Sequence, residues 1–324
     1  MDVERKIPLE RLELFLRLFR QRVSNPSEVR PCVRCWKESE LKAEIKALIR
    51  AHSHELFEST FPSATTLIKH LENVGWVRPL PIEPLDVVAP KRFFLLDSDG
   101  ADGSTVEPLE LLQAWLPGGV ISYFAALSFH GLTTQVPPFL HIGRLLPPAL
   151  ERPASPALQA KPQASTATKE RNPLGTEGFR YDGRSYYLTK RDSALVPGVQ
   201  LRVASPRTWL RITTFEQTLL DTLLQPVRCG GTAVVFEAWE NGAGELDADR
   251  LASHLTAIDR PELDRRVGAI SDVIGFQPSS GALRQRLDEA RRKAAASGSA
   301  MEEIPLLPGC ICSTPASTWR VLLP

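Results

Sequence analysis

An acidic, glycine-rich break near residue 100 divides this sequence into two parts. Residues 97–105 read Asp-Ser-Asp-Gly-Ala-Asp-Gly-Ser-Thr, with a single alanine as the apolar residue. Such a composition is typical of a flexible linker. A chain of 324 residues is also long enough for two domains of ordinary size. We therefore predict an N-terminal domain over residues 1–96, a linker over residues 97–104 and a C-terminal domain over residues 105–324.

The composition excludes several classes of protein. Hydrophobic residues make up 43% of the chain and charged residues 24%, which is typical of a globular protein rather than a disordered one. No apolar run approaches the roughly 20 residues that a bilayer-spanning helix needs. The N-terminus lacks the apolar segment of a secretory signal, so we expect a cytoplasmic protein without a membrane partner. Because the formal net charge is only +1, any nucleic-acid binding must come from a local patch.

Three helices and a two-stranded ribbon are predicted for the N-terminal domain. Apolar residues recur at helical spacing over three segments, residues 8–23, 38–57 and 64–73. Extended runs follow from Trp76 and over residues 91–96, separated by a proline-rich turn. This order is that of a winged helix-turn-helix, in which the third helix enters the major groove of DNA and the ribbon contacts the backbone.

The third predicted helix carries the polar side chains that base recognition needs. Ser63 is a suitable N-cap for it, and Leu67, Ile68, Leu71 and Val74 form an apolar stripe along one side. Short hydrogen-bonding side chains therefore remain on the other side, facing base edges. The candidate base contacts are Thr65, Thr66, Lys69, His70 and Asn73, and the candidate phosphate contacts of the ribbon are Arg78, Lys91 and Arg92.

Two further interpretations of this domain stay open. Winged helices also serve as protein-docking modules, and the local charge excess is small for a protein whose DNA affinity would be mostly electrostatic. Cys32 and Cys35 form a Cys-x-x-Cys pair, but a zinc site needs a second pair of ligands. Cys310 and Cys312 have a one-residue gap, which is not a usual zinc spacing. We therefore expect two ordinary thiols in a loop, and no metal or other cofactor.

The C-terminal domain is predicted to be mixed, with a small antiparallel sheet and several helices, so that the whole chain belongs to the α+β class. Gly118–Pro137 combines apolar residues at helical spacing with polar side chains, and we expect a small buried helix there. Asp182-Gly183 between two aromatic-rich arms favours a type I′ hairpin. Residues 146–175 are rich in Pro, Ala, Ser and Thr, which indicates a disordered insertion. Further strands are expected over residues 139–143, 199–203, 208–212 and 319–322, and helices over residues 108–116, 215–224, 232–240, 248–258, 261–274 and 281–296.

Searches for catalytic motifs point away from an enzyme. The chain has no P-loop, no Gly-x-Ser-x-Gly elbow, no His-Glu-x-x-His and no dinucleotide-binding glycine motif. Glu216, Asp221, Glu237 and Glu240 are the candidates for a metal-dependent nuclease, but Glu216 and Asp221 stand five residues apart on a predicted helix and share no face. His130 follows a helix and precedes a glycine, so we expect a backbone hydrogen bond rather than acid–base chemistry.

Two segments of the C-terminal domain together resemble a known family. The first comprises Gly118-Gly119-Val120-Ile121-Ser122, Ala126-Leu127, His130-Gly131-Leu132-Thr133 and Gln135-Val136-Pro137. The second comprises Ile212-Thr213-Thr214, Glu216, Thr218-Leu219-Leu220-Asp221 and Cys229-Gly230-Gly231, and the chain ends with Trp319-Arg320-Val321. In order and spacing, these blocks resemble the AbiEi-type antitoxins of type IV toxin–antitoxin (abortive-infection) systems. The insertion and the N-terminal loop with the Cys-x-x-Cys pair depart from the family pattern.

This resemblance implies a function. Proteins of that family carry an N-terminal winged helix that represses their own promoter at inverted repeats, and a C-terminal domain that counteracts a nucleotidyltransferase toxin, often without a stable complex, in bacterial phage defence. It implies a non-enzymatic transcriptional repressor and antitoxin, with double-stranded DNA and the toxin as partners. A protein-docking accessory of a defence operon and a metal-dependent nuclease are the alternatives. The family motifs include five polar residues that we expect to serve as scaffold: Ser122, His130, Gln135, Thr214 and Asp221.

Overall fold

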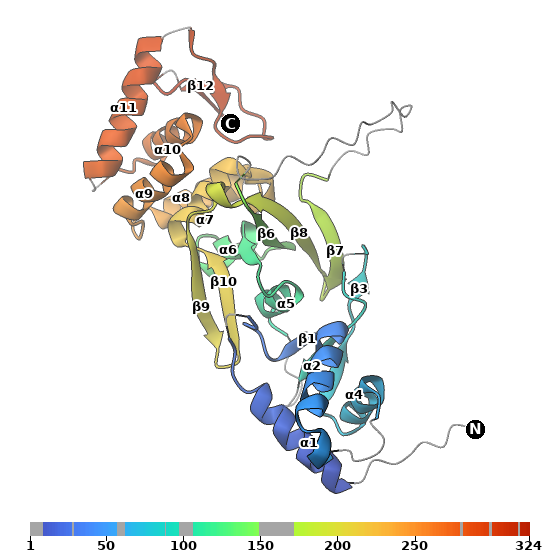
Figure 1. The fold of residues 1–324 in the computed structure, drawn as a ribbon. Helices are drawn as coiled ribbons and strands as arrows, with labels where there is room; N and C mark the ends of the chain where they lie inside the picture. Colours follow the sequence, from blue (N-terminus) through green and yellow to red (C-terminus); the bar gives the residue numbers. More distant parts are fainter. Residues whose placement is uncertain are drawn as a thin grey trace, which may run out of the picture. The chain divides into compact units, whose positions relative to one another are not determined.

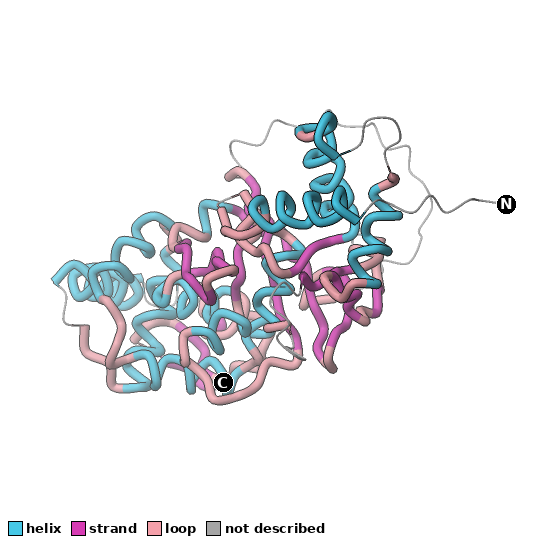
Figure 2. The backbone as a smooth tube through the Cα atoms, turned by 90° about the horizontal axis from the view of Figure 1, so that it is seen from below, coloured by secondary structure: helices cyan, strands magenta, loops and turns pink. Residues whose placement is uncertain are grey.

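The protein is a mixture of α-helices and small β-sheets, as expected for the α+β class (Figure 1). The computed structural model describes residues 9–27, 29–56, 62–87, 89–96, 106–148, 172–278, 281–297, 300–316 and 318–324. Contacts divide the chain into two compact units. Unit 1 comprises Met1–Gly118, Gly178–Asp182 and Leu201–Arg211, and unit 2 comprises Gly119–Glu177, Gly183–Gln200 and Ile212–Pro324. Helices and strands occur in both units. Figure 2 colours the helices and strands of the chain separately.

The first helices of unit 1 are α1 (Leu9–Arg22), α2 (Glu38–Ala51), α3 (Ser53–Leu56) and α4 (Ala64–Asn73). Their apolar faces form one core, in which Phe15 of α1, Ile45 of α2 and Leu67 of α4 are fully buried. The prediction of one continuous helix over residues 38–57 is wrong, because the helix is interrupted at His52. The backbone of His52 leaves the helical conformation, with φ −122° and ψ 33°, and so separates α2 from α3.

A three-stranded antiparallel sheet completes this core. Its strands lie in the order β1-β4-β2, with β1 at Cys35–Lys37, β4 at Phe93–Leu96 and β2 at Val77–Leu80. The two extended runs predicted after α4 are therefore confirmed, whereas β1 was not predicted. Between β2 and β4, the short strand β3 (Glu83–Pro84) pairs with residues Phe179 and Arg180 of β7 (Thr176–Tyr181).

Helix α5 (Pro108–Trp115) also belongs to unit 1. The Trp115 ring packs edge-on against Phe179, with centroids 5.1 Å apart, and the Lys37 ammonium donates to the Trp115 carbonyl at 3.1 Å. The sequence predicts this helix correctly but assigns it to the C-terminal domain, whereas its contacts group it with the N-terminal helices. The predicted linker, residues 97–104, lies outside the described residues.

The sheet of unit 2 is mixed rather than antiparallel. Its strands β8 (Arg184–Asp192), β6 (Phe139–Leu146), β5 (Val120–Ser122) and β10 (Thr208–Thr213) lie side by side in that order. β6 runs parallel to β8 along its whole length, and β5 runs antiparallel to β6 but parallel to β10. The prediction of an antiparallel sheet was wrong because β6 pairs in parallel with β8, and β7 lies between these two strands in the sequence but not in the sheet. Parallel neighbours need such a long connection, and local sequence does not specify which strands it joins.

The stretch Gly118–Pro137 forms a strand, a sharp turn and a helix, where one small helix was expected. β5 ends at Ser122, Tyr123 takes φ 62° and ψ −134°, and α6 (Phe124–Phe129) follows directly. Val120 and Ile121 are fully buried. Periodicity cannot separate a buried strand from a buried helix in so short an apolar run. Gly131, two residues after the end of α6, has a left-handed φ of 68°.

Most other predictions of secondary structure for this part of the chain are confirmed. The Asp182-Gly183 turn has positive φ at both residues, as a type I′ hairpin requires. The expected insertion lies largely in residues 149–171, outside the described ranges. The remaining elements are β9 (Val199–Ser205), α7 (Phe215–Leu224), α8 (Thr232–Gly242), α9 (Ala248–Ile258), α10 (Pro261–Ile274), α11 (Gly281–Ser297), β11 (Ile304–Pro305), β12 (Thr314–Ala316), β13 (Val321–Leu323) and two 3-10 turns, η1 (Ser193–Leu195) and η2 (Pro226–Cys229). Within the described ranges, no helix combines the length and the apolar composition that a membrane crossing requires.

Candidate functional site

Helix α4 presents a polar surface to solvent. The Ser63 hydroxyl caps the helix by accepting a hydrogen bond from the Thr66 amide at 3.1 Å, as the sequence predicts. Thr65, Lys69 and Asn73 are exposed, on the side opposite the buried apolar residues. These three side chains are therefore available to a ligand that approaches the helix.

Two of the predicted α4 contacts are less available. The Thr66 hydroxyl shares a hydrogen bond of 2.8 Å with Ser63 and so takes part in the cap. His70 is half-buried, and its Nε2 is buried without a hydrogen-bond partner in the described structure. The helical pattern placed both residues on the polar side correctly, but it does not predict which side chains fold back onto the protein.

The predicted ribbon contacts all lie in unit 1 and are exposed. Arg78 stands on β2, opposite Leu95 of β4, and Lys91 and Arg92 directly precede β4. The Arg92 carbonyl accepts a hydrogen bond from the Glu38 amide at 3.1 Å, which holds this loop against the start of α2. The ribbon is thus tied to the helical core by its backbone, and its basic side chains remain at the surface.

Some of the Lys and Arg side chains in this unit form ion pairs with Asp or Glu, and others do not. Residues 1–96 contain sixteen Lys and Arg against thirteen Asp and Glu, so the formal excess is small. Around α2, Lys37 and Lys42 pair with Glu40 and Glu38, each at 2.5 Å, and Arg30 pairs with Glu44 at 3.2 Å. By contrast, the three cations Lys69, Lys91 and Arg92 form no ion pair with another described residue. Uncompensated cations therefore lie on α4 and the ribbon, and also on α1 and α2, where Arg17, Lys46 and Arg50 form no ion pair with another described residue.

Both thiols of the Cys-x-x-Cys pair are buried, and Cys35 lies in a strand rather than in the expected loop. Cys35 begins β1, and burial raises the pKa of the Cys32 thiol to about 12, with the nearby Glu110 carboxylate acting in the same direction. The Glu110 carboxylate accepts a hydrogen bond from the Thr208 hydroxyl at 2.9 Å and forms an ion pair with Arg34 at 3.4 Å. In the part of the chain that the structure describes, no group of three or more His, Cys, Asp or Glu side chains is arranged to hold a metal ion.

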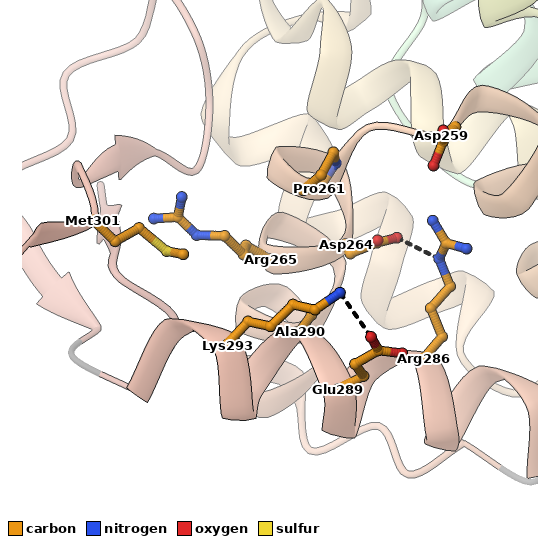
Figure 3. A pocket seen from close by; sticks show the side chains of 9 residues that line it. All are labelled: Asp259, Pro261, Asp264, Arg265, Arg286, Glu289, Ala290, Lys293 and Met301. Carbon is orange, nitrogen blue, oxygen red and sulfur yellow. Dashed lines mark hydrogen bonds and ion pairs between the residues drawn. The ribbon is translucent and has the colours of Figure 1, made fainter. Parts of the chain in front are cut away.

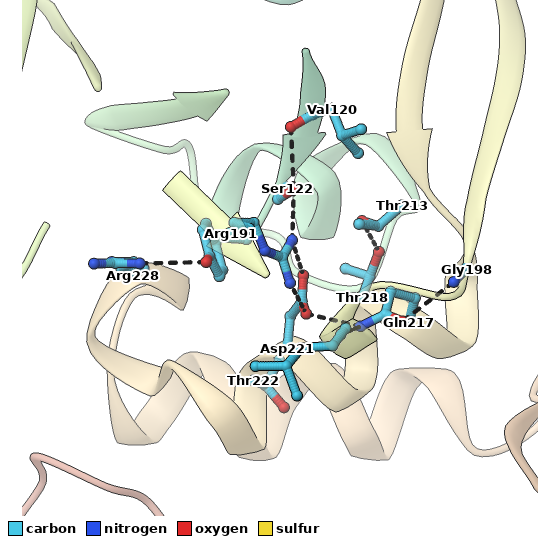
Figure 4. Close-up of polar contacts among 12 residues, drawn as sticks. Val120, Ser122, Arg191, Gly198, Thr213, Gln217, Thr218, Asp221, Thr222 and Arg228 are labelled. Atoms are coloured by element: carbon cyan, nitrogen blue, oxygen red, sulfur yellow. Dashed lines mark hydrogen bonds and ion pairs between the residues drawn. The ribbon is translucent and has the colours of Figure 1, made fainter. Parts of the chain in front are cut away.

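A buried network in unit 2 joins the two sequence segments that carry the family resemblance (Figure 4). We call it the Arg191 network, and it consists of Ser122, Arg191, Gln217 and Asp221. Arg191 donates to both carboxylate oxygens of Asp221, at 2.5 and 2.9 Å, and to the Ser122 hydroxyl at 2.8 Å. Gln217 adds a hydrogen bond to Asp221 at 3.0 Å. The side chains of Asp221 and Arg191 are 0% and 6% exposed, so water does not share these contacts.

Tyr123 lies beside this network in a strained conformation. Its φ of 62° with ψ −134° is nearly confined to glycine, and such a geometry costs on the order of 1–3 kcal/mol. The Arg191 guanidinium lies 4.7 Å from the ring centroid, and Arg228 donates to the phenol oxygen at 3.3 Å. The His141 ring packs edge-on at 5.3 Å, and burial lowers the pKa of His141 to about 3. These contacts hold the tyrosine in the turn between β5 and α6.

The acidic residues of the nuclease alternative, Glu216, Asp221, Glu237 and Glu240, form no group of three or more that could hold a metal ion in the described structure. Asp221 is occupied by Arg191 and Gln217. Glu237 accepts hydrogen bonds from the Thr134 amide and hydroxyl, both at 2.7 Å. Glu216 receives the Asp247 amide at 3.3 Å. Their carboxylates are bound by protein donors at separate places, which does not provide the shared oxygen ligands that a catalytic metal requires.

The other motif residues also make contacts within unit 2. His130 Nε2 lies 2.8 Å from the Thr213 carbonyl oxygen, the backbone hydrogen bond expected from the sequence. Thr214 caps α7 by accepting from the Gln217 amide at 3.3 Å, and its hydroxyl lies 3.0 Å from His254 Nε2. Gln135 reaches Glu237 at 3.5 Å.

Sequence reasoning missed Arg191 although a signal was present. Tyr187, Thr189 and Arg191 alternate along β8 and are all buried, while Lys190 between them is exposed. Successive side chains of a strand point to opposite faces. An arginine on the buried face of a strand needs a carboxylate partner. Asp221, on the predicted helix at residues 215–224, could therefore have been predicted as that partner.

A small cavity of about 210 Å³ lies among the C-terminal helices of unit 2 (Figure 3). Its charged lining is largely self-compensated, because Arg286 pairs with Asp264 at 2.7 Å and Lys293 pairs with Glu289 at 2.7 Å. Burial raises the pKa of Asp264, an effect that the Arg286 hydrogen bond opposes. None of the residues predicted from sequence as contacts lines this cavity.

Comparisons with known proteins show a likeness in fold. No protein-family model matches the chain, and no curated protein matches it in sequence. The crystal structure of the RV2827C protein from Mycobacterium tuberculosis superposes with a TM-score of 0.55 at 16% sequence identity. The match covers 98% of this chain and 92% of that chain. At this identity, the likeness concerns the fold.

Proposed function

We propose that this protein is a cytoplasmic DNA-binding repressor of its own operon and an antitoxin that counteracts a nucleotidyltransferase toxin. The observation that carries the DNA-binding half is the surface of α4 with its ribbon. Exposed Thr65, Lys69 and Asn73 lie on a capped helix, and three cations without an ion pair to another described residue, Lys69, Lys91 and Arg92, lie on the helix or directly before β4. Base edges would meet the helix, and phosphates would meet Lys91 and Arg92.

The order of elements in unit 1 supports this proposal. Helices α1, α2 and α4 precede β2 and β4, and the sheet order β1-β4-β2 places the last strand in the middle. That arrangement is expected of a winged helix, whose second helix of the helix-turn-helix pair is α4 here. Ten residues at about 1.5 Å per residue make a helix of roughly 15 Å, which suits a major groove about 12 Å wide.

The antitoxin half rests on the resemblance and on how its two segments meet. His130 of the first segment binds the Thr213 carbonyl of the second, and Ser122 of the first shares Arg191 with Asp221 of the second. A Cβ atom at Gly230 would lie 2.8 Å from the Phe124 ring. Residues of the two segments that are 83 positions or more apart in sequence therefore contact one another or share a partner in space, which is consistent with the two segments forming one structural unit.

A binding titration on the DNA upstream of the gene tests the repressor half. Fluorescence anisotropy at several salt concentrations should show saturable binding that weakens with salt, with a log–log slope of about −0.9 per phosphate contact. Lys69→Ala should weaken binding about tenfold, within the 1–3 kcal/mol of one good base contact. Lys46→Ala is the matched control, because Lys46 is an exposed lysine of α2 in the same unit. Equal losses for both variants, or no salt-sensitive binding, would contradict the proposed interface and favour the protein-docking alternative.

A growth assay tests the antitoxin half separately. A nucleotidyltransferase encoded by the adjacent gene should arrest growth when expressed alone, and co-expression of this protein should restore growth. Lys69→Ala should still restore it, because α4 lies in the other unit from the resembling segments. Loss of rescue in Lys69→Ala would mean that neutralisation runs through α4.

A further inference from the structure

Strand β9 has an exposed edge without the usual protection. It is the last strand of its sheet in the described structure, and β10 is its hydrogen-bonded neighbour there. Along its seven residues, positions 201 to 204 are all exposed. An edge strand presents a row of unpaired N–H and C=O groups that can pair with another extended chain.

The side chains of β9 increase this tendency. Leu201 is 46% exposed and Val203 is 72% exposed, and as alternate residues they project from the same face of the strand. Natural edge strands are often protected by proline, lysine or a bulge. β9 contains no proline, lysine or glycine, and Arg202 is its one charged residue. The outer part of this strand thus combines free backbone groups with two exposed apolar side chains.

The residues of this hairpin and its flanks carry charge of one sign. Between Ser193 and Phe215 the chain carries three arginines, Arg202, Arg207 and Arg211, and no Asp or Glu. Arg202 is exposed and makes no hydrogen bond or ion pair with another described residue. Residues Leu201–Arg211, which form the outer part of the hairpin of β9 and β10, all belong to unit 1. The two strands are labelled in Figure 1.

We propose that the outer edge of β9 receives an extended acidic segment of a partner protein as an added β-strand. Main-chain hydrogen bonds would supply affinity, and alternate apolar side chains of the partner would pack against Leu201 and Val203. Carboxylates at the intervening positions would pair with Arg202. This inference is independent of DNA binding by α4.

The observations favour such a segment over two other occupants. A second copy of this chain would bring another arginine-bearing edge without acidic residues, and like charges on paired strands are destabilising. The phosphates of a nucleic acid would pair with the arginines, but a nucleic acid would not pack against the two exposed apolar side chains or form strand hydrogen bonds with the backbone of β9. An acidic extended peptide satisfies all three features.

A defined peptide makes the proposal testable on the full chain. The probe is fluorescein-labelled Glu-Val-Glu-Val-Glu-Val-Glu, which matches the seven residues of β9, and binding is read by fluorescence anisotropy at low salt. Val203→Asp and Arg202→Glu should each weaken binding about tenfold or more, and Arg17→Glu on α1 is the matched control that should leave it within about twofold. Circular dichroism should be unchanged in all three variants, because all three positions are exposed.

Two altered peptides separate strand addition from simple charge attraction. The same sequence with alternate peptide nitrogens methylated should bind at least about tenfold more weakly, because it cannot complete the strand hydrogen bonds. A Lys-Val version should bind poorly to the native chain and better to Arg202→Glu. Each of these results would support the added strand.

Several outcomes would overturn the proposal. The native chain could fail to bind the acidic peptide, or the methylated peptide could bind as well as the parent. A dimer in light scattering that Val203→Asp converts to monomer would assign the edge to a second copy. A reduced salt slope of DNA binding in Arg202→Glu, together with no peptide binding, would assign it to nucleic acid. None of these results bears on the Lys69 test of the proposed function.

Discussion

Replacing Asp221 with asparagine tests whether the Arg191 network holds unit 2 together. The substitution keeps the shape of the side chain but removes the charge that faces Arg191, whose own side chain is 6% exposed. The guanidinium then stays buried without a counter-charge. Removing one partner of a buried ion pair costs about 3–5 kcal/mol. The Gln217 hydrogen bond to the same carboxylate oxygen would be disturbed as well.

The expected loss is large enough to measure by two methods. For a unit of roughly 190 residues, each kcal/mol changes the melting temperature by about 2–4 °C, so Asp221→Asn should lower it by about 6–20 °C. Urea unfolding followed by tryptophan fluorescence includes a reporter in the same region, although four of the six tryptophans lie in unit 1. Trp239 is buried in unit 2 and donates to the Thr222 hydroxyl, next to Asp221, at 2.9 Å.

Two comparisons decide what the measured loss means. Glu289→Gln removes the carboxylate of the exposed Lys293 pair, and no measurable change in stability is expected, because solvent screens such pairs. The double variant Arg191→Met with Asp221→Leu removes both charges and should be more stable than Asp221→Asn alone. A loss below about 1 kcal/mol in Asp221→Asn, or a double variant less stable than the single one, would refute the reasoning.

Three further predictions follow from other contacts. His141→Phe should flatten the acid side of the stability profile. The folded pKa of about 3 lies below the unfolded value of about 6.5, so the unfolded chain takes up a proton first, and this residue lowers the unfolding free energy by about 1.4 kcal/mol per pH unit from pH 6 to pH 4. Urea titrations at pH 4, 5 and 6 should show a steeper fall in the native chain than in the variant, which keeps His254, whose pKa burial also lowers. Gly268→Ala should destabilise unit 2 by about 1–3 kcal/mol, because the new Cβ would lie 2.2 Å from the Trp319 ring; Gly244→Ala, with no heavy atom within 4 Å, should stay within about 0.5 kcal/mol in the same thermal melts. Ser63→Ala should lose about 1 kcal/mol of local stability through the missing N-cap of α4, seen as faster amide hydrogen exchange in that helix, and exchange at the native rate would contradict the cap.

The candidate interface shows how far a local pattern reaches. The 3.6-residue period predicted that Thr65, Lys69 and Asn73 face solvent, and they do. Val74, which the same period placed on the apolar stripe, is 45% exposed, because α4 ends at Asn73. The same pattern did not predict that Thr66 joins the cap or that the His70 ring turns back toward the protein. Those outcomes depend on side-chain rotamers and neighbouring elements, which a periodic pattern does not specify.

The sequence by itself determined the features that arise within a few residues of chain. Ser63 and Thr214 cap their helices, and Asp182-Gly183 turns the hairpin with positive φ at both positions. Each of these depends on a hydrogen bond or a backbone preference that is local, so it can be recognised in the sequence.

Only the tertiary structure decided the pairings between distant residues. Ser122 meets Arg191 across 69 positions and Arg191 meets Asp221 across 30. β6 pairs in parallel with β8, although β7 separates them in the sequence and local patterns predicted an antiparallel sheet. The physical reason is that burial raises the energy of any unpaired charge or backbone group. The partner that satisfies it is set by the packing of the whole unit and not by neighbours along the chain.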